Sequence, residues 1–328
     1  MKNTTFFQKY GIVVVLAGLI VFFTIMSPAF LTVDNLFNVA RQVSMIGITS
    51  VGMMFVMLTG GIDLSVGSVL AFVNVVCAYF MVKMNMNPWA ACLLCMVISA
   101  GFGFLNGVII TKWRVPPIIS SMGFMNILSG LAFIISGGLP IYGFDPNFTI
   151  MGQGYISIIP IPVIIMIGIF ILGWFILNKT YFGRYFYAIG GNEEAAKLAG
   201  INVISTKQMV YMLSGIFASL AGIIMLSRLN SGQPTTGTGF EFEVIIAVVL
   251  GGVSVNGGSG RIFGVVIGVL IMGILSNGLV LMNVNDYVQD VVQGIVLVIA
   301  VGFDCVSKAK SESKLKESVK NKGNAVSA

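Results

Sequence analysis

The sequence predicts an all-α, polytopic membrane protein, and two features of its composition support this class. Hydrophobic residues make up 57% of the 328 residues, whereas charged residues make up only 9%. A water-soluble domain carries roughly 25% charged residues, because its surface must face water. The 40 glycines suit helices that pack closely in lipid, where no hydrophobic force drives them together.

Ten apolar segments are candidate transmembrane helices, since the hydrocarbon core of a bilayer takes about 20 helical residues to cross. The second and the eighth segments are short and flanked by glycine, so either could be broken or tilted instead of spanning plainly. The ten segments are residues 10–27, 43–59, 66–82, 88–110, 117–136, 158–177, 208–227, 243–256, 262–282 and 286–304.

The distribution of Lys and Arg predicts the orientation, because these residues are favoured on the cytoplasmic side. With the N-terminus inside and ten alternating spans, all basic residues but three lie inside; the exceptions are Arg41, Lys83 and Arg228. Both termini are therefore expected in the cytoplasm. Residues 1–304 form the transmembrane domain, with a cytoplasmic loop at about 178–207, and residues 305–328 form a basic cytoplasmic tail.

Several kinds of chemistry find no support in the residues. Histidine is absent, which removes the usual general base and the commonest metal ligand. The four cysteines have no accompanying soft ligands, so no metal site is predicted. The net charge of +6 is concentrated in the tail and indicates no nucleic acid partner. The glycine-rich segment Val249–Arg261 lacks the Gly-Lys-Ser/Thr of a phosphate-binding loop, so nucleotide binding is not expected there.

The cytoplasmic loop contains a short helix whose two ends are written in the sequence, Asn192–Gly200. The Asn192 side chain can accept a free first-turn amide. Glu193 and Glu194 follow it, where negative charge meets the positive end of the helix dipole. Gly200 suits the left-handed position just after a helix. The sequence therefore predicts a capped helix of about two turns.

Such a helix is well below the roughly 12–15 residues needed for stability alone in water, so something must hold it. One interpretation is packing against the protein's own cytoplasmic surface. The other is docking to a soluble partner, with Ala195 and Ala196 allowing close approach and Gly183 and Arg184 bracing the entry to the segment.

A second candidate is the segment Thr59–Gly67, in which Gly60 and Gly61 are expected to break the helix. The freed backbone groups must then be buried in protein or line a wet cavity. Asp63 is an acid close to the membrane, where such a residue suggests a role. It either caps the following helix at the interface or contacts a solute, and the capping interpretation is favoured.

Two asparagines lie inside otherwise apolar segments, Asn106 and Asn277, each followed by glycine. Interhelical hydrogen bonds are the main interpretation, and a position along a transport pathway is the alternative. We therefore take Gly60, Gly61 and Asp63 with these two asparagines as candidate pathway or gate residues.

These stretches together resemble the permease subunits of the ribose-type branch of ABC importers, which carry ribose, xylose, galactose and autoinducer sugars. The resemblance covers about residues 30–304 and includes the pair Asn277-Gly278. It rests on GGIDLSVGS (60–68), GRYFYAIGGNEEAAKLAGI (183–201), LSGIFASLAGII (213–224) and VVLGGVSVNGGSGRIFG (248–264).

The resemblance implies a permease in a bacterial cytoplasmic membrane that imports a monosaccharide, a ribose-like pentose being favoured. It implies a homodimer with the pathway between two copies and a helix within residues 183–201 that couples to a cytoplasmic ATP-binding subunit. It also implies an extracytoplasmic sugar-binding protein. This chain would bind no cofactor and hydrolyse no ATP, since ATP and Mg belong to the partner subunit.

The main rival class is an ion-coupled secondary transporter of a small polar solute. Such a protein usually carries an acid near the middle of the membrane or a sodium site made by broken helices. Here the acids cluster at the edges of the predicted spans, which weakens proton coupling but leaves sodium coupling open.

Overall fold

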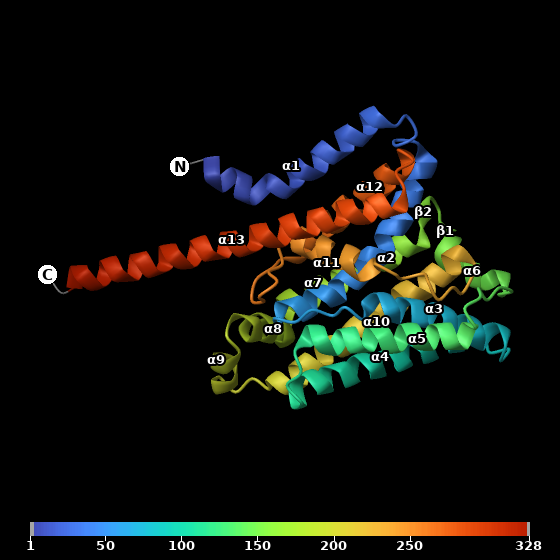
Figure 1. Cartoon of the computed structure of the whole chain (residues 1–328), viewed down its shortest axis with the longest axis horizontal. Coiled ribbons are helices and arrows are strands. Elements are labelled where there is room, and N and C mark those ends of the chain that lie inside the picture. The colour runs from blue at the N-terminus through green and yellow to red at the C-terminus, as the bar shows by residue number, and fades with distance from the viewer. Residues whose placement is uncertain (1–2, 327–328) are drawn as a thin grey trace.

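The computed structural model describes residues 3–326, with side chains described for residues 11–306 apart from Pro146. The chain forms a bundle of helices with one two-stranded hairpin (Figure 1). Its elements are α1 (Asn3–Met26), α2 (Val33–Leu58), α3 (Val66–Val82), α4 (Pro88–Lys112), α5 (Pro117–Ser136), α6 (Pro146–Gln153), β1 (Tyr155–Ile156), β2 (Ile159–Pro160), α7 (Ile161–Lys179), α8 (Tyr181–Gly191), α9 (Glu193–Leu198), α10 (Val203–Leu229), α11 (Phe240–Leu250), α12 (Ile262–Leu281) and α13 (Asp286–Val326).

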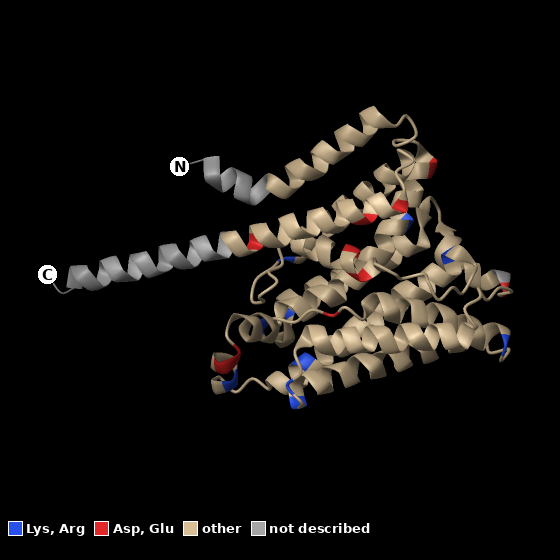
Figure 2. Cartoon of the chain, in the orientation of Figure 1, with Lys and Arg blue, Asp and Glu red and all other residues tan. Residues whose placement is uncertain are grey.

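The all-α membrane class is confirmed. Seven of the described helices are long and apolar enough to cross a membrane by length and composition: α2, α4, α5, α7, α10, α12 and the part of α13 up to Val306. Two shorter apolar helices are Gly11–Met26 and Val66–Val82. The bundle has two ends: α9 lies at one, and α6 with the hairpin lies at the other (Figure 1). Most Lys and Arg lie toward these ends, whereas several acidic residues lie between them (Figure 2).

Helices α2 and α10 form the centre of the bundle. Helix α10 packs against α2, α3 and α4, and α2 also packs against α7 and α12. Most of the side chains of α2 and α10 are buried inside the protein, whereas most of those of α5, α7 and α13 are half-buried or exposed. The short second segment of the sequence prediction, residues 43–59, is in fact part of a helix of 26 residues, because polar residues in its first turns hid its true start.

The eighth predicted segment, residues 243–256, is a short helix. Helix α11 has only 11 residues, about half of what a full span needs. Before it, the chain from residue 230 to 239 runs beside α3: the Gln233 amide donates to Asn74 Oδ1 at 2.7 Å. A Cβ added at Gly237 would overlap the carbonyl oxygen of Gly67. Helices α11 and α3 therefore begin beside each other.

Glycines bring α4 and α10 into backbone contact. A Cβ added at Gly103 would overlap the carbonyl oxygen of Tyr211, and one added at Gly107 would lie 2.8 Å from Gln208 Cα. A Cβ added at Gly215 on the facing helix would lie 2.5 Å from the Ser99 carbonyl oxygen. Gly103 and Gly107 thus act in helix packing, which is the expected use of small residues spaced four apart.

We predict that Gly103→Val destabilises the folded protein by about 1–3 kcal/mol, the usual cost of overpacking a tight contact. Gly101→Val is the matched control, because nothing lies within 4 Å of a Cβ added there. Thermal melting of the detergent-solubilised protein, followed by size-exclusion chromatography, compares the two. Equal melting temperatures for both variants would contradict the close contact.

Candidate functional site

Helix α9 is capped at both ends as the sequence predicts. Asn192 Oδ1 accepts from the Ala195 amide at 2.9 Å. At the other end Gly200 has φ +83°, and the amides of Gly200 and Ile201 donate to the carbonyls of Lys197 and Ala196. This is the Schellman arrangement, in which a left-handed residue satisfies the last carbonyl groups of the helix. The shape of this short helix therefore comes largely from its own residues.

One face of α9 is buried against the protein and the other is exposed. Ala196 is 4% exposed and forms a small cluster with Ile189 of α8 and Val203 of α10. Leu198, by contrast, is 90% exposed, and Ala195 is exposed as well. Ala196 thus anchors α9 to the protein instead of facing outward as the docking interpretation expected, and Ala195 and Leu198 lie on the exposed face.

An ion pair fastens α9 to the start of α10. Lys207 Nζ lies 2.7 Å from Glu193 Oε2, and Lys197 lies 3.2 Å from the same carboxylate and 2.9 Å from Glu194. The hydrogen bond from Lys207 lowers the pKa of the Glu193 carboxyl, and Lys197 adds to this. Because this pKa is depressed, the ion pair persists at neutral pH and is lost only as the pH falls through the lowered value.

The sequence did not predict helix α8. Its last residue, Gly191, is separated from the first residue of α9 by Asn192 alone. Gly183 lies at the turn from α7, where an added Cβ would overlap the carbonyl oxygen of Leu177. Arg184 is exposed on α8. A glycine is therefore required at position 183 by the tight turn into α8. The Arg184 side chain lies on the surface of the protein.

Three backbone segments that are distant in sequence meet at the C-terminal end of α8, just before α9. A Cβ added at Gly190 would overlap the carbonyl oxygen of Leu58, at the end of α2. The Gly258 amide donates to the same carbonyl at 3.0 Å. We call the contact of Leu58, Gly190 and Gly258 the glycine joint. In the sequence, the pairs Gly190-Gly191 and Gly257-Gly258 indicate that each segment allows a close backbone approach. Neither pair shows that the two segments contact each other.

Further hydrogen bonds extend from the glycine joint. Tyr187 Oη of α8 donates to the Gly260 carbonyl at 2.9 Å. On the same loop, Ser254 Oγ donates to Asp304 Oδ2 of α13 at 3.1 Å. The loop 251–261 is thus attached to α8 on one side and to α13 on the other.

Asp63 lies inside the bundle, at the start of α3. It is 2% exposed; its Oδ1 accepts from the Ser65 amide at 3.1 Å, and its Oδ2 accepts from Ser214 Oγ, near the middle of α10, at 2.8 Å. Gly60 has φ +78°, and a Cβ added at Gly61 would overlap Tyr211 Oη. The segment therefore turns tightly, and Asp63 links the start of α3 to α10.

The two candidate asparagines join helices. Asn106 Oδ1 of α4 accepts from Ser120 Oγ of α5 at 2.6 Å. Asn277 of α12 exchanges two hydrogen bonds with Asn35 of α2, each of 2.9 Å. Both asparagines are buried, and neither lines either of the two cavities that follow.

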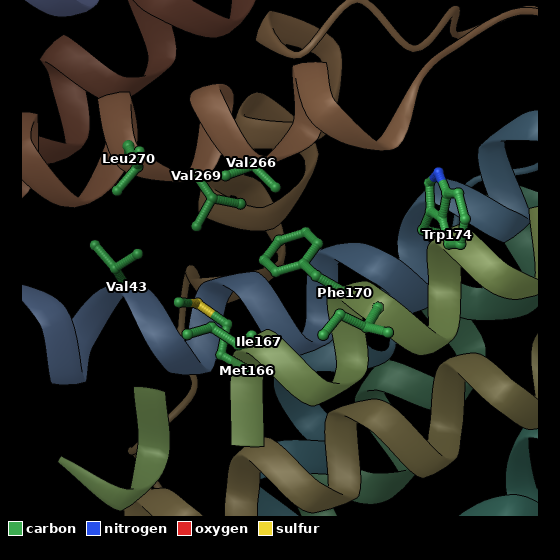
Figure 3. Close-up of a pocket in the computed structure, with 9 residues that line it drawn as sticks. Val43, Met166, Ile167, Phe170, Trp174, Val266, Val269 and Leu270 are labelled. Atoms are coloured by element: carbon green, nitrogen blue, oxygen red, sulfur yellow. The ribbon is translucent and has the colours of Figure 1, made fainter. Parts of the chain in front are cut away.

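Two cavities differ in chemistry. One, of about 270 Å³, lies between α2, α7 and α12 and is lined by apolar side chains, including Val43, Phe170 and Trp174 (Figure 3). The other, of about 100 Å³, lies where α3 and α11 begin. Its lining is mixed, with the polar side chains of Ser68, Asn126 and Glu241 beside apolar residues such as Ala71 and Met125. The sequence placed Glu241 at the edge of a span, but could not show that the preceding non-helical segment, residues 230–239, carries it beside α3.

A bundle of helices, seven of them long and apolar enough to cross a membrane among the described residues, is the architecture of a multi-pass membrane protein. The chain belongs to the family described as branched-chain amino acid transport system / permease component, whose profile matches residues 35–301. It is accordingly a multi-pass protein of the cytoplasmic membrane.

Similar proteins include two ribose import permeases and an arabinose permease. The ribose import permease protein RbsC of Bacillus subtilis is 46% identical over 90% of this chain and 92% of its own length. RbsC of Escherichia coli is 45% identical over 89% of this chain and 92% of its own length. The L-arabinose transport system permease protein AraH of Escherichia coli is 40% identical over 90% of both chains. No solved structure matches.

Proposed function

We propose that the chain is the membrane-spanning permease subunit of an ATP-driven ABC importer that carries a monosaccharide, a ribose-like pentose, into the cell. The observation that carries this proposal is α9, a capped helix with Leu198 90% exposed, held on the bundle by Ala196 and by the Glu193–Lys207 ion pair. The relatives support the solute class, since two are ribose permeases and one is an arabinose permease.

In the proposed topology the chain has ten spans and both termini in the cytoplasm, so that α9 also faces the cytoplasm. The non-helical residues 230–239 and α11 together form one interrupted span. Two copies of the chain enclose the pathway. A cytoplasmic ATP-binding subunit, which holds ATP and Mg, docks on α9, and an extracytoplasmic binding protein delivers the sugar from the other side.

The proposed mechanism is alternating access driven through the glycine joint. When the ATP-binding subunit closes on ATP, it moves α9 and α8. Because Gly190 has no side chain, its backbone lies in direct contact with the backbone of Leu58 and Gly258. A displacement of α8 at Gly190 therefore displaces these two residues as well. The movement then reaches α2 and the loop 251–261, which leads into α12 and is bonded to α13.

The first test is Leu198→Glu, which places a charge on the exposed face of α9. A buried leucine contributes about 1.5–3 kcal/mol, so we expect binding of the ATP-binding subunit to weaken by about tenfold or more. Leu139→Glu is the control, because Leu139 is 70% exposed but lies in the loop after α5. Co-purification and sugar uptake are measured at matched membrane levels. Uptake that needs no ATP-binding subunit would instead indicate an ion-coupled secondary transporter.

The second test is Gly190→Ala, with Gly191→Ala as its control. An added methyl group overlaps the Leu58 carbonyl at position 190 but meets nothing within 4 Å at position 191. We expect Gly190→Ala to keep the ATP-binding subunit bound and ATP hydrolysis active, while sugar uptake per ATP falls about tenfold. Unchanged uptake per ATP would rule out transmission through the glycine joint.

A further inference from the structure

The small polar cavity occupies an unusual place, because two helices begin beside it inside the bundle. The first turn of α3 and the first turn of α11 contribute Ser68 and Glu241, and α5 contributes Asn126 and Ser129. Its volume of about 100 Å³ exceeds the roughly 10–15 Å³ that a single water requires. In this conformation it thus admits part of a small solute.

Glu241 is held in this cavity by its surroundings. Its side chain is 6% exposed, in the first turn of α11, where a carboxylate meets the positive end of the helix dipole. A Cβ added at Gly67 would overlap Glu241 Oε2. The glycine at position 67 therefore leaves the room that the carboxylate occupies.

Asn126 adds a second polar group to the lining, from helix α5. It lies near the middle of α5, a candidate membrane span, and it is exposed. An exposed amide facing lipid would be costly, since hydrocarbon offers it no hydrogen bonds. This face of α5 is therefore suited to a wet surface, which is where a pathway between two copies would run.

The lining suits a neutral solute rich in hydroxyl groups. A carboxylate accepts hydrogen bonds from hydroxyls, while the Asn126 amide and the Ser68 and Ser129 hydroxyls both donate and accept. The lining residues include no Lys or Arg, so an anionic solute would meet the carboxylate without compensation.

We propose that this cavity is a contact site for the transported monosaccharide, in which Glu241 and Asn126 hydrogen-bond to sugar hydroxyls during passage. The assignment rests on the proposed function and deepens it. The apolar cavity beside Trp174 offers no comparable set of donors and acceptors. Asp63 and Asn277 already have hydrogen-bond partners within the protein. Asn106 Oδ1 accepts from Ser120 Oγ, and Asn106 lies outside the lining of this cavity.

The test uses proteoliposomes that contain the complete transporter, with the ATP-binding subunit and the sugar-binding protein, and ribose as the probe. Glu241→Gln is compared with Glu243→Gln. Glu243 lies on the same helix but outside the cavity lining, and its carboxylate accepts from Gln293 Nε2 at 3.1 Å. We expect Glu241→Gln to lower uptake per ATP about tenfold, and Glu243→Gln to remain within about twofold of the parent.

A second measurement does not depend on uptake. In a Cys305→Ser background, which removes the exposed cysteine, Asn126→Cys is treated with a charged, water-soluble thiol reagent. Ile127→Cys is the control, because Ile127 is the adjacent exposed residue outside the cavity. We expect the reagent to modify Asn126→Cys and ribose to slow this modification during ATP turnover, with no protection at position 127.

The outcomes separate the two proposals. If the parent transporter takes up no monosaccharide, the proposed function fails and the cavity assignment fails with it. If the parent transports ribose but Glu241→Gln equals the parent, or ribose does not protect Asn126→Cys, the cavity assignment alone fails. Protection by sodium in place of ribose would likewise overturn the sugar assignment and indicate a cation site.

Discussion

The contact between Gly190, Leu58 and Gly258 constrains three parts of the chain at once, because it joins backbone to backbone with no side chain between them. A flexible side chain at such a point would absorb a displacement by changing rotamer. Two glycines and a carbonyl oxygen contribute no flexible side chain that could absorb such a displacement. The positions of α8, the end of α2 and the loop 251–261 are therefore set together. Together with the Ala196 cluster and the Glu193–Lys207 ion pair, this contact determines the place of α9 on the surface.

The same close packing continues into the bundle. From Leu58 the chain turns through Gly60 and Gly61 to Asp63, which bonds to Ser214 of α10. Helix α3 then begins inside the protein, beside the start of α11, and the polar cavity lies against both first turns. The exposed helix α9 at one end of the bundle and the cavity within it are thus connected through short segments held by hydrogen bonds. Asn106 and Asn277 serve this architecture by joining helices.

The local features could be predicted from the sequence, whereas the contacts between distant segments could not. Asn192 and Gly200 determine the ends of α9 through their own hydrogen bonds and backbone angles, so their pattern was sufficient. The inward orientation of Ala196 depends on Ile189 and Val203, and the position of Glu241 depends on how residues 230–239 run beside α3. Hydropathy also misjudged the length of α2, because it measures apolar length and does not register where a helix begins. It correctly marked the segment of α11 as short. The coupling role of residues 183–200 stays a prediction.

The most direct measurement of transmission through the glycine joint is a pair of spin-label distances in the complete transporter, with both labels on one copy and Cys305→Ser. One pair, Gly191→Cys with Ser259→Cys, spans the joint; the other, Ser259→Cys with Trp113→Cys, relates the loop 251–261 to the end of α4. We predict that ATP binding leaves the first distance unchanged and changes the second. A change in the first distance, with the second constant, would contradict a joint that moves as one body.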